Sequence, residues 1–366
     1  MHYKHIQHPE NDPSFKGLSV NEGVNNAPTI NPYAHPKHKR TQYSATEFVE
    51  KILIGDISML SQAVTLVESS LPEHQIIAQE VIEKCLPFSG NSIRLGITGV
   101  PGAGKSTFIE ALGMHLIRQG RKLAVLAIDP SSERSKGSIL GDKTRMEELS
   151  VSKNAFIRPS PSAGSLGGVA RKTRESIILC EAAGFDIVFV ETVGVGQSET
   201  SVHSMVDFFL LLQLAGAGDE LQGIKRGIME MADGIAINKC DGSNIDKASV
   251  AKTQYQNALH LFPPHDSGWS PEAITCSSIE LNGISDIWNM VERYITFVKS
   301  SHFFDIKRNS QAKYWMYETI NERLKNNFYN NPEIQKLLLE SEKKVLSNEI
   351  SSFVAAKKMM DNYFNS

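Results

Sequence analysis

The residues best suited to chemistry form a glycine-rich stretch, Gly99-Val-Pro-Gly-Ala-Gly-Lys-Ser106, with the spacing G-x-x-x-x-G-K-[ST]. Such glycines let backbone amides point inward around phosphate oxygens, and the N-terminus of a following helix reinforces that anion nest. Lys105 would carry a positive charge to the β- and γ-phosphates, and the Ser106 hydroxyl would bind Mg²⁺. The stretch follows the apolar run Ile93–Thr98 and opens a helix predicted over Thr107–Gln119, as a P-loop requires. We therefore predict a catalytic role for Lys105 and phosphate binding by Gly99, Val100, Pro101, Gly102, Ala103, Gly104, Lys105, Ser106 and Thr107.

Acidic residues follow two other apolar runs, where carboxyl ends of strands would meet the phosphate loop. Asp129 ends the run Leu123–Ile128, and Glu191 ends the run Ile187–Val190. Glu191-Thr-Val-Gly194 has the layout of a D-x-x-G switch with Glu in place of Asp, so the Gly194 amide would bind the γ-phosphate. Asp142 lies in a polar stretch where a switch segment would be, and a solvated surface charge is its alternative. The predicted Mg²⁺ ligands are Ser106, Asp129, Asp142 and Glu191.

A second set of residues has the types needed to recognise guanine. Asn238-Lys-Cys-Asp241 follows the apolar run Gly234–Ile237 and matches N-K-x-D. The Asp241 carboxylate can accept from both guanine donors, whereas adenine would leave it unpaired. Asn238 would brace the loop, and the Lys239 stem would lie over the base. The stretch Ser277–Gly283 occupies the place of an S-A-x loop, with Ser where Ala is usual, so Ser277, Ser278 and Ile279 complete the predicted guanine site. We predict GTP rather than ATP.

The residue that orients the attacking water is harder to find. Small signalling GTPases place a glutamine directly after the D-x-x-G glycine, but here that residue is Val195. Gln197 is the candidate, and a capping or surface role is its alternative. No arginine finger is evident, a group worth roughly 10³–10⁵ in rate. We therefore predict slow hydrolysis that a partner protein accelerates.

The elements that must position these residues are those of an α/β protein. From about residue 92, short apolar runs alternate with longer helical segments, which indicates a mainly parallel sheet covered by helices on both faces. The predicted strands are Ile93–Ile97, Leu123–Ile128, Ile187–Val190, Phe208–Leu212, Gly234–Ile237 and Ala273–Cys276. We predict the GTPase domain over residues 89–299.

Both flanks of this domain have a different character. Residues 1–42 are polar and rich in Asn, Pro and His, so we predict a flexible leader. Residues 43–88 begin with the capping box Ser44–Glu47 and show helical periodicity, with apolar positions that include Phe48, Ile57, Ile76 and Val81. Residues 300–366 predict a helical arm, with helices over 311–328, 332–346 and 347–364. An arm that cannot bury its apolar stripe alone favours a homodimer.

The composition excludes several other classes. The chain has 366 residues, 41% hydrophobic and 22% charged, and its formal net charge of -3 gives no basic excess for nucleic acid or an anionic membrane. No apolar run approaches the roughly 18 residues of a membrane span. The four cysteines are scattered without a CxxC pair, which fits a reducing compartment. The sequence therefore predicts a cytoplasmic protein.

Several strings together resemble the MeaB/ArgK GTPases, and the similarity runs from about residue 45 to 300. The strings are Gly99–Thr107, Asp129–Ser132, Gly137–Met146, Glu191–Glu199 and Gly216–Lys225. The resemblance implies a G-protein chaperone that gates cofactor delivery to an adenosylcobalamin-dependent acyl-CoA mutase, chiefly methylmalonyl-CoA mutase, and that protects the mutase. It also implies a P-loop fold, a homodimer held by C-terminal helices, and a further switch at Asp219–Lys225 that faces the mutase. A plain helix start is the alternative for that switch.

Three other functions are compatible with parts of the sequence. A nickel-insertion GTPase would explain the leader histidines, five of the eleven in the chain, although the cysteines are dispersed. An arginine/ornithine transport kinase would need an acceptor pocket and a base, which no motif marks. A scaffold with a dead site is opposed by the intact Lys105, Ser106 and strand-end acids.

Overall fold

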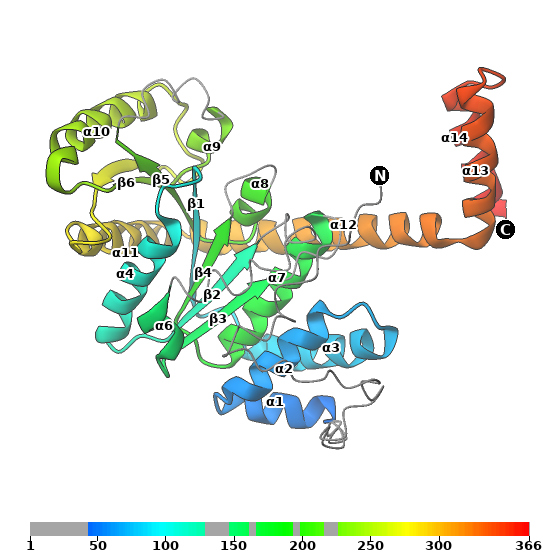
Figure 1. The fold of residues 1–366 in the computed structure, drawn as a ribbon. Helices are drawn as coiled ribbons and strands as arrows, with labels where there is room; N and C mark the ends of the chain where they lie inside the picture. Colours follow the sequence, from blue (N-terminus) through cyan, green and yellow to red (C-terminus); the bar gives the residue numbers. More distant parts are fainter. Residues whose placement is uncertain (1–42, 129–145, 161–165, 193–197, 216–225, 366) are drawn as a thin grey trace, which may run out of the picture. The chain divides into compact units, whose positions relative to one another are not determined.

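The central element is a seven-stranded sheet in the order β3-β2-β4-β1-β5-β6-β7, in which every neighbouring pair is parallel (Figure 1). The structure is a computed structural model that describes residues 43–128, 146–160, 166–192, 198–215 and 226–365. The strands are β1 Ile93–Gly99, β2 Leu123–Ile128, β3 Ala155–Ser160, β4 Ile187–Thr192, β5 Phe208–Leu214, β6 Gly234–Asn238 and β7 Glu272–Thr275. The predicted α/β fold with a parallel sheet and a P-loop is confirmed.

The strands are apolar along their length because helices cover both faces of the sheet. Helices α4 and α11 contact one face through β1, β2, β5 and β7, while α7 and α8 contact β2, β4 and β1 on the other (Figure 1). The helices of this part are α4 Lys105–Arg118, α6 Glu147–Val151, α7 Leu166–Ala182, α8 Ser198–His203, α9 Arg226–Glu230, α10 Ile245–Leu259 and α11 Ile284–Ser300. Two short 3₁₀ helices are η2 Leu86–Phe88 and η3 Gly242–Asn244.

The sequence analysis missed one strand, β3. Its residues include Arg158 and Pro159, which interrupt the apolar pattern of a buried strand. Proline lacks an N–H and is therefore tolerated at a sheet edge, which is where β3 lies. β1, β4, β5 and β6 extend beyond their predicted ends, and β7 begins and ends one residue earlier than predicted. Glu191 and Asn238 are therefore the penultimate residue of β4 and the last residue of β6 rather than the residues that follow.

Within residues 43–92, three α-helices precede the sheet: α1 Ala45–Leu53, α2 Ile57–Glu68 and α3 Pro72–Cys85. The predicted capping box is confirmed, since the Ser44 amide donates to Glu47 Oε2 (2.7 Å) and the Glu47 amide donates to Ser44 Oγ (3.3 Å). All three helices contact α7. The predicted apolar stripe is confirmed at Phe48 and Val81, which are buried, and is wrong at Ile57 and Ile76, which are 38% and 71% exposed. In α3 the buried face includes Ala78 in addition to Val81.

Three helices follow α11: α12 Phe303–Asn330, α13 Pro332–Leu346 and α14 Ser352–Asn365. The predicted start of the first helix at residue 311 is wrong, because Lys307 and Arg308 lie inside α12 and bond to residues before β5. The predicted start of the third helix at residue 347 is also wrong, because α14 begins at Ser352. Asn348 has a φ of 58°, which is not helical, and lies in the turn between α13 and α14. Within the described part of the chain, no helix is both long and apolar enough to cross a membrane.

Candidate nucleotide-binding site

The predicted phosphate loop joins β1 to α4. Gly99 packs so closely on β5 that a Cβ at this position would lie 2.2 Å from the Leu212 carbonyl oxygen. Gly104 caps α4 with a φ of 83°, which favours glycine. The loop therefore needs glycine at both positions for steric reasons. It leads directly into Lys105 and Ser106, the buried first residues of α4, which begins two residues earlier than predicted.

Lys105 folds back over this loop. Its Nζ donates to the Gly99 carbonyl (2.9 Å) and lies 3.4 Å from the Val100 carbonyl. Burial lowers the pKa of Lys105, while the carboxylates of Glu191 and Glu199 act in the opposite direction. The ammonium thus lies at the mouth of the loop in a partly desolvated, acidic environment, where it can exchange carbonyl acceptors for phosphate oxygens.

The carboxyl ends of β1 and β4 meet beside the loop. Glu191 is buried and pairs in register with Ile97 of β1 and Ala127 of β2. Next to it, Thr192 Oγ1 donates to Thr98 Oγ1 (2.8 Å), a buried contact that fixes the two strand ends together. This threonine pair was not predicted from the sequence, because Thr192 is a variable position of the Glu191–Gly194 motif and Thr98 precedes the P-loop.

Two of the predicted metal ligands can be placed. Ser106 opens α4 and Glu191 lies near the end of β4, so a hydroxyl and a carboxylate, hard oxygen ligands that suit Mg²⁺, flank the loop. Among the residues that the structure describes, no group of three or more His, Cys, Asp or Glu could hold a metal. The predicted residues Asp129, Asp142, Gly194 and Gln197 and the segment 219–225 lie outside the described residues.

Asn238 connects the phosphate loop to the predicted guanine loop. Its Nδ2 donates to the Ala103 carbonyl (2.8 Å), and its Oδ1 accepts from the Ser278 amide (3.2 Å) and the Ser278 hydroxyl (2.8 Å). Asn238 is 1% exposed, so its amide makes these bonds away from water. Breaking these buried hydrogen bonds would cost free energy, so they hold the phosphate loop and the guanine loop together.

The Asp241 carboxylate is oriented by its neighbour across the sheet edge. Ser277 Oγ donates to Asp241 Oδ2 (2.6 Å) and accepts from the Glu280 amide (3.1 Å). The Ser277 side chain therefore positions Asp241. This role was not predicted from the similarity of Ser277–Gly283 to an S-A-x loop. Lys239 has a φ of 59°, and its carbonyl accepts from Asn244 Nδ2 (2.7 Å). Ile279 is largely exposed.

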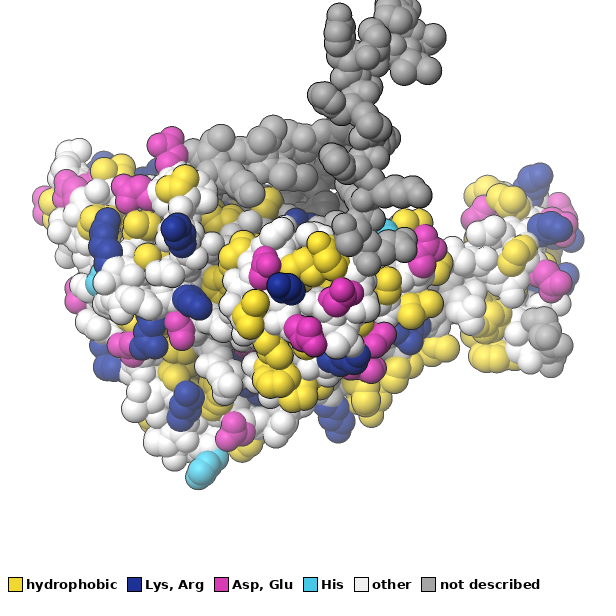
Figure 2. All heavy atoms as spheres, turned by 90° about the horizontal axis from the view of Figure 1, so that it is seen from below, with side chains coloured by type: hydrophobic (Ala, Val, Ile, Leu, Met, Phe, Trp, Pro, Cys, Tyr) yellow, Lys and Arg dark blue, Asp and Glu magenta, His cyan; other side chains and the backbone are white. Residues whose placement is uncertain are grey.

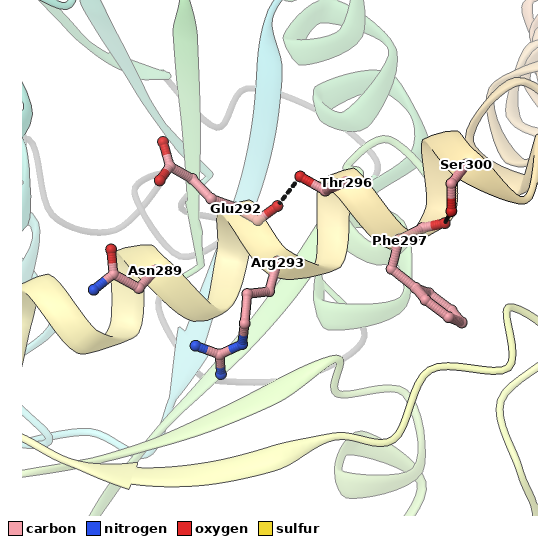
Figure 3. A pocket seen from close by; sticks show the side chains of 6 residues that line it. All are labelled: Asn289, Glu292, Arg293, Thr296, Phe297 and Ser300. Carbon is pink, nitrogen blue, oxygen red and sulfur yellow. Dashed lines mark hydrogen bonds between the residues drawn. The ribbon is translucent and has the colours of Figure 1, made fainter.

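A hollow of about 520 Å³ along α11 is separate from these loops (Figure 3). Thr296 Oγ1 donates to the Glu292 carbonyl (2.8 Å) and Ser300 Oγ to the Phe297 carbonyl (2.7 Å), so both hydroxyls bond within the helix. Arg293 pairs with Glu272 at 2.8 Å. The Thr296 and Ser300 hydroxyls and Arg293 thus already have partners within the protein, and none of the predicted phosphate or guanine residues lines this hollow.

Comparisons with known proteins agree with this geometry. The family model described as "Methylmalonyl Co-A mutase-associated GTPase MeaB" matches residues 60–333. The chain is 47% identical over 305 residues to "GTPase ArgK" of Escherichia coli K12, which covers 83% of this chain and 92% of that protein. It is 44% identical over 323 residues to the mouse "Methylmalonic aciduria type A homolog, mitochondrial". This match covers 84% of this chain and 78% of the mouse protein.

A solved structure is also similar. The "Crystal structure of LAO/AO transport system kinase" is 39% identical, with a TM-score of 0.70, and the match covers 88% of this chain and 98% of that one. The family description and the name of the E. coli relative both say GTPase, and in this chain the P-loop sequence follows β1 of a parallel sheet. The protein is a GTPase, and it belongs to the MeaB family of methylmalonyl-CoA mutase-associated GTPases.

Proposed function

We propose that this GTPase gates cofactor delivery to an adenosylcobalamin-dependent acyl-CoA mutase, methylmalonyl-CoA mutase in the first place, and protects that mutase. The observation that supports the nucleotide site most directly is the double contact of Asn238 with Ala103 and Ser278, because it makes phosphate and base recognition one unit. The mutase as partner rests on the description of the matching family and on the mouse relative's name.

The phosphates of GTP would occupy the concave side of Gly99–Thr107. Lys105 Nζ would exchange the carbonyls of Gly99 and Val100 for β- and γ-phosphate oxygens, which bear full negative charge and are better acceptors. Mg²⁺ would be held by Ser106 and Glu191, together with Asp129 and Asp142. When bound, the ion neutralises charge that develops on the phosphates. Gly194 and Gln197 would bind the γ-phosphate and orient the attacking water.

The base would lie against Asp241. Its Oδ2 already accepts from Ser277, which leaves Oδ1 and the remaining lone pairs for guanine N1–H and the exocyclic amine. Lys239 would cover one face of the base, and the backbone of Ser278 and Ile279 would contact its oxygen. Adenine has neither donor, so the site would select GTP and GDP.

The C-terminal helices would hold a homodimer. Large apolar side chains on them are exposed, among them Leu324 at 59%, Leu346 at 84% and Phe353 at 84%. Figure 2 shows hydrophobic side chains at the surface of the molecule. Since a monomer rarely leaves so many of them exposed together, a second copy would bury them. Sedimentation of Leu346→Asp and Phe353→Asp is expected to show monomers where the unchanged protein shows dimers.

The function is tested by adding the mutase to the purified GTPase. GTP hydrolysis is expected to be slow alone and to rise severalfold or more with purified methylmalonyl-CoA mutase, since no arginine finger is evident in this chain. A GTP analogue and GDP should also change the rate at which cobalamin passes to the apo-mutase in opposite directions. Fast hydrolysis that the mutase does not change would contradict the proposal.

A further inference from the structure

Helix α12 is bonded to the short turn that links α8 to β5. Trp315 Nε1 donates to the Ser204 carbonyl (3.1 Å), and Gln311 Nε2 donates to the Val206 carbonyl (2.8 Å). One turn earlier, Lys307 Nζ donates to the Asp207 carbonyl (2.6 Å). Three donors spaced four residues apart, on one face of α12, thus bond to three carbonyls of the segment between α8 and β5.

The side chains of Trp315 and Gln311 are both buried. Trp315 is 6% exposed and Gln311 is 7% exposed, so neither contact is a mobile surface bond. Their acceptors continue α8 directly, because the Ser204 amide closes the last helical turn onto the Thr200 carbonyl (3.1 Å). Holding the Ser204 carbonyl therefore holds the end of α8 itself.

α8 and the turn that follows it also pack against β1. A Cβ on Gly96 would lie 2.9 Å from Val202 Cγ1 and 2.9 Å from Val206 Cγ2. α8 and the turn after it therefore pack against β1 too closely to admit an added methyl group. Val202 and Val206 are fully buried. α8 is thus clamped between β1, which leads to the phosphate loop, and the donors of α12.

The first turn of α8 lies close to β4, because α8 contacts β4 and only five residues separate Thr192, the last residue of β4, from Ser198. This turn carries Glu199, which is 4% exposed. Since Ser198–His203 is less than two helical turns long, a displacement of its last turn would also displace Glu199. The geometry therefore connects the donors of α12 to the reacting end of the site.

We propose that Gln311 and Trp315 are positioning residues for GTP hydrolysis, which hold α8 and its buried Glu199 in place next to β4, where Glu191 lies near the strand end. The inference rests on the nucleotide site proposed above. Neither side chain touches the phosphate loop or the guanine loop, so both act on the rate of hydrolysis and leave nucleotide binding unchanged. A misplacement of about 1 Å near reacting groups can lower a rate roughly 10²-fold.

The test compares Trp315→Phe and Gln311→Met with Trp269→Phe in the full chain. The first two remove one donor each while keeping most of the side-chain volume. Trp269 Nε1 makes the same kind of bond, to the Asp233 carbonyl (2.9 Å), but that carbonyl precedes β6 and not β5. We expect single-turnover GTP hydrolysis to fall roughly tenfold or more in Trp315→Phe and Gln311→Met, with Kd for GTP and GDP unchanged. Trp269→Phe should hydrolyse GTP at the unchanged rate.

Gly96→Ala displaces α8 and the turn after it from the side of β1 while it leaves the donors of α12 intact, and it should give the same lowered rate with unchanged Kd. Unchanged rates in these variants would overturn the positioning role, as would an equal loss in Trp269→Phe or a parallel loss of affinity. These outcomes are distinct from failure of the nucleotide site, in which the unchanged protein would bind or hydrolyse no GTP. Thermal unfolding of each variant shows that the rates are those of folded protein.

Discussion

Asn238 Nδ2 lies 2.8 Å from the Ala103 carbonyl, so the last residue of β6 holds the phosphate loop that follows β1. The other end of the same amide accepts from the amide and hydroxyl of Ser278. Neighbouring strands alone would not fix the distance between the two loops, because loops move more freely than the sheet. The Asn238 amide sets that distance.

The first prediction concerns this connection. Asn238→Ala removes a donor and an acceptor and leaves the Ala103 carbonyl and the Ser278 amide buried without partners. Such loss costs about 1–3 kcal/mol. We expect a lower Tm and GTP and GDP affinities weaker by roughly tenfold or more, measured by unfolding scans and calorimetry.

Asn244→Ala is the matched control, because Asn244 bonds the Lys239 carbonyl of the same loop from an exposed position. It should change the Tm and the affinity little. Equal losses in both variants would mean that general weakening of the guanine loop, and not its link to the phosphate loop, lowers the affinity.

The second prediction concerns base selection. In Asp241→Asn the side-chain oxygen can still accept from Ser277, so the loop should keep its conformation, while the amide now offers a donor to the base. Xanthine has an acceptor where guanine has the exocyclic amine. We expect the preference to move from GTP toward xanthosine triphosphate by roughly 100-fold, from about 3 kcal/mol of reversed pairing. Competition binding measures it, and unchanged GTP affinity would place the base elsewhere.

The third prediction concerns the phosphate loop. Lys105→Ala should abolish GTP hydrolysis and weaken GTP binding by roughly tenfold or more, since a charged hydrogen bond contributes about 1.5–3 kcal/mol. The free protein should unfold at a similar temperature, because removing a partly desolvated ammonium offsets the loss of its bonds to Gly99 and Val100. Lys84→Ala, at an exposed lysine, is the control. Retained hydrolysis would show that another group binds the γ-phosphate.

Much of this arrangement could be predicted from the sequence, because chemistry and steric demands coincide there. The P-loop and N-K-x-D residues are needed at fixed spacings, and each follows an apolar strand. The strand β3 could not be predicted in the same way, since an edge strand tolerates Pro159 and needs fewer apolar residues.

Contacts between distant segments could not be predicted from one chain. Ser277 and Asp241 are 36 residues apart, and Trp315 and Ser204 are 111 apart, so only the folded sheet and α12 bring them together. The charged start of α12 was missed for a related reason. Its Lys307 and Arg308 look solvated in the sequence, whereas in the structure they bond to Asp207.

The fourth prediction concerns His203, at the end of α8. Burial lowers its pKa to about 4, the positive charge of Lys307 and the neighbouring His265 act in the same direction, and Asp233 acts against them. Its ring packs edge-on against Phe209, with centroids 5.6 Å apart. In the unfolded chain the pKa returns to roughly 6.5. The folded state therefore holds His203 neutral at a pH where the unfolded state binds a proton.

The sign follows from that difference. The contribution of neutral His203 to the free energy of unfolding is fully present above about pH 6.5 and is lost as the pH falls toward 4. At pH 5 the loss amounts to about 2 kcal/mol. His203→Gln cannot take up this proton, so its free energy of unfolding should fall about 2 kcal/mol less between pH 7 and pH 5 than that of the unchanged protein, measured by urea unfolding. Carboxylates titrate in both proteins and cancel in the comparison. His260→Gln, at an exposed histidine, should keep the full pH dependence. If His203→Gln also keeps it, the proton is taken up elsewhere and the end of α8 is open to water.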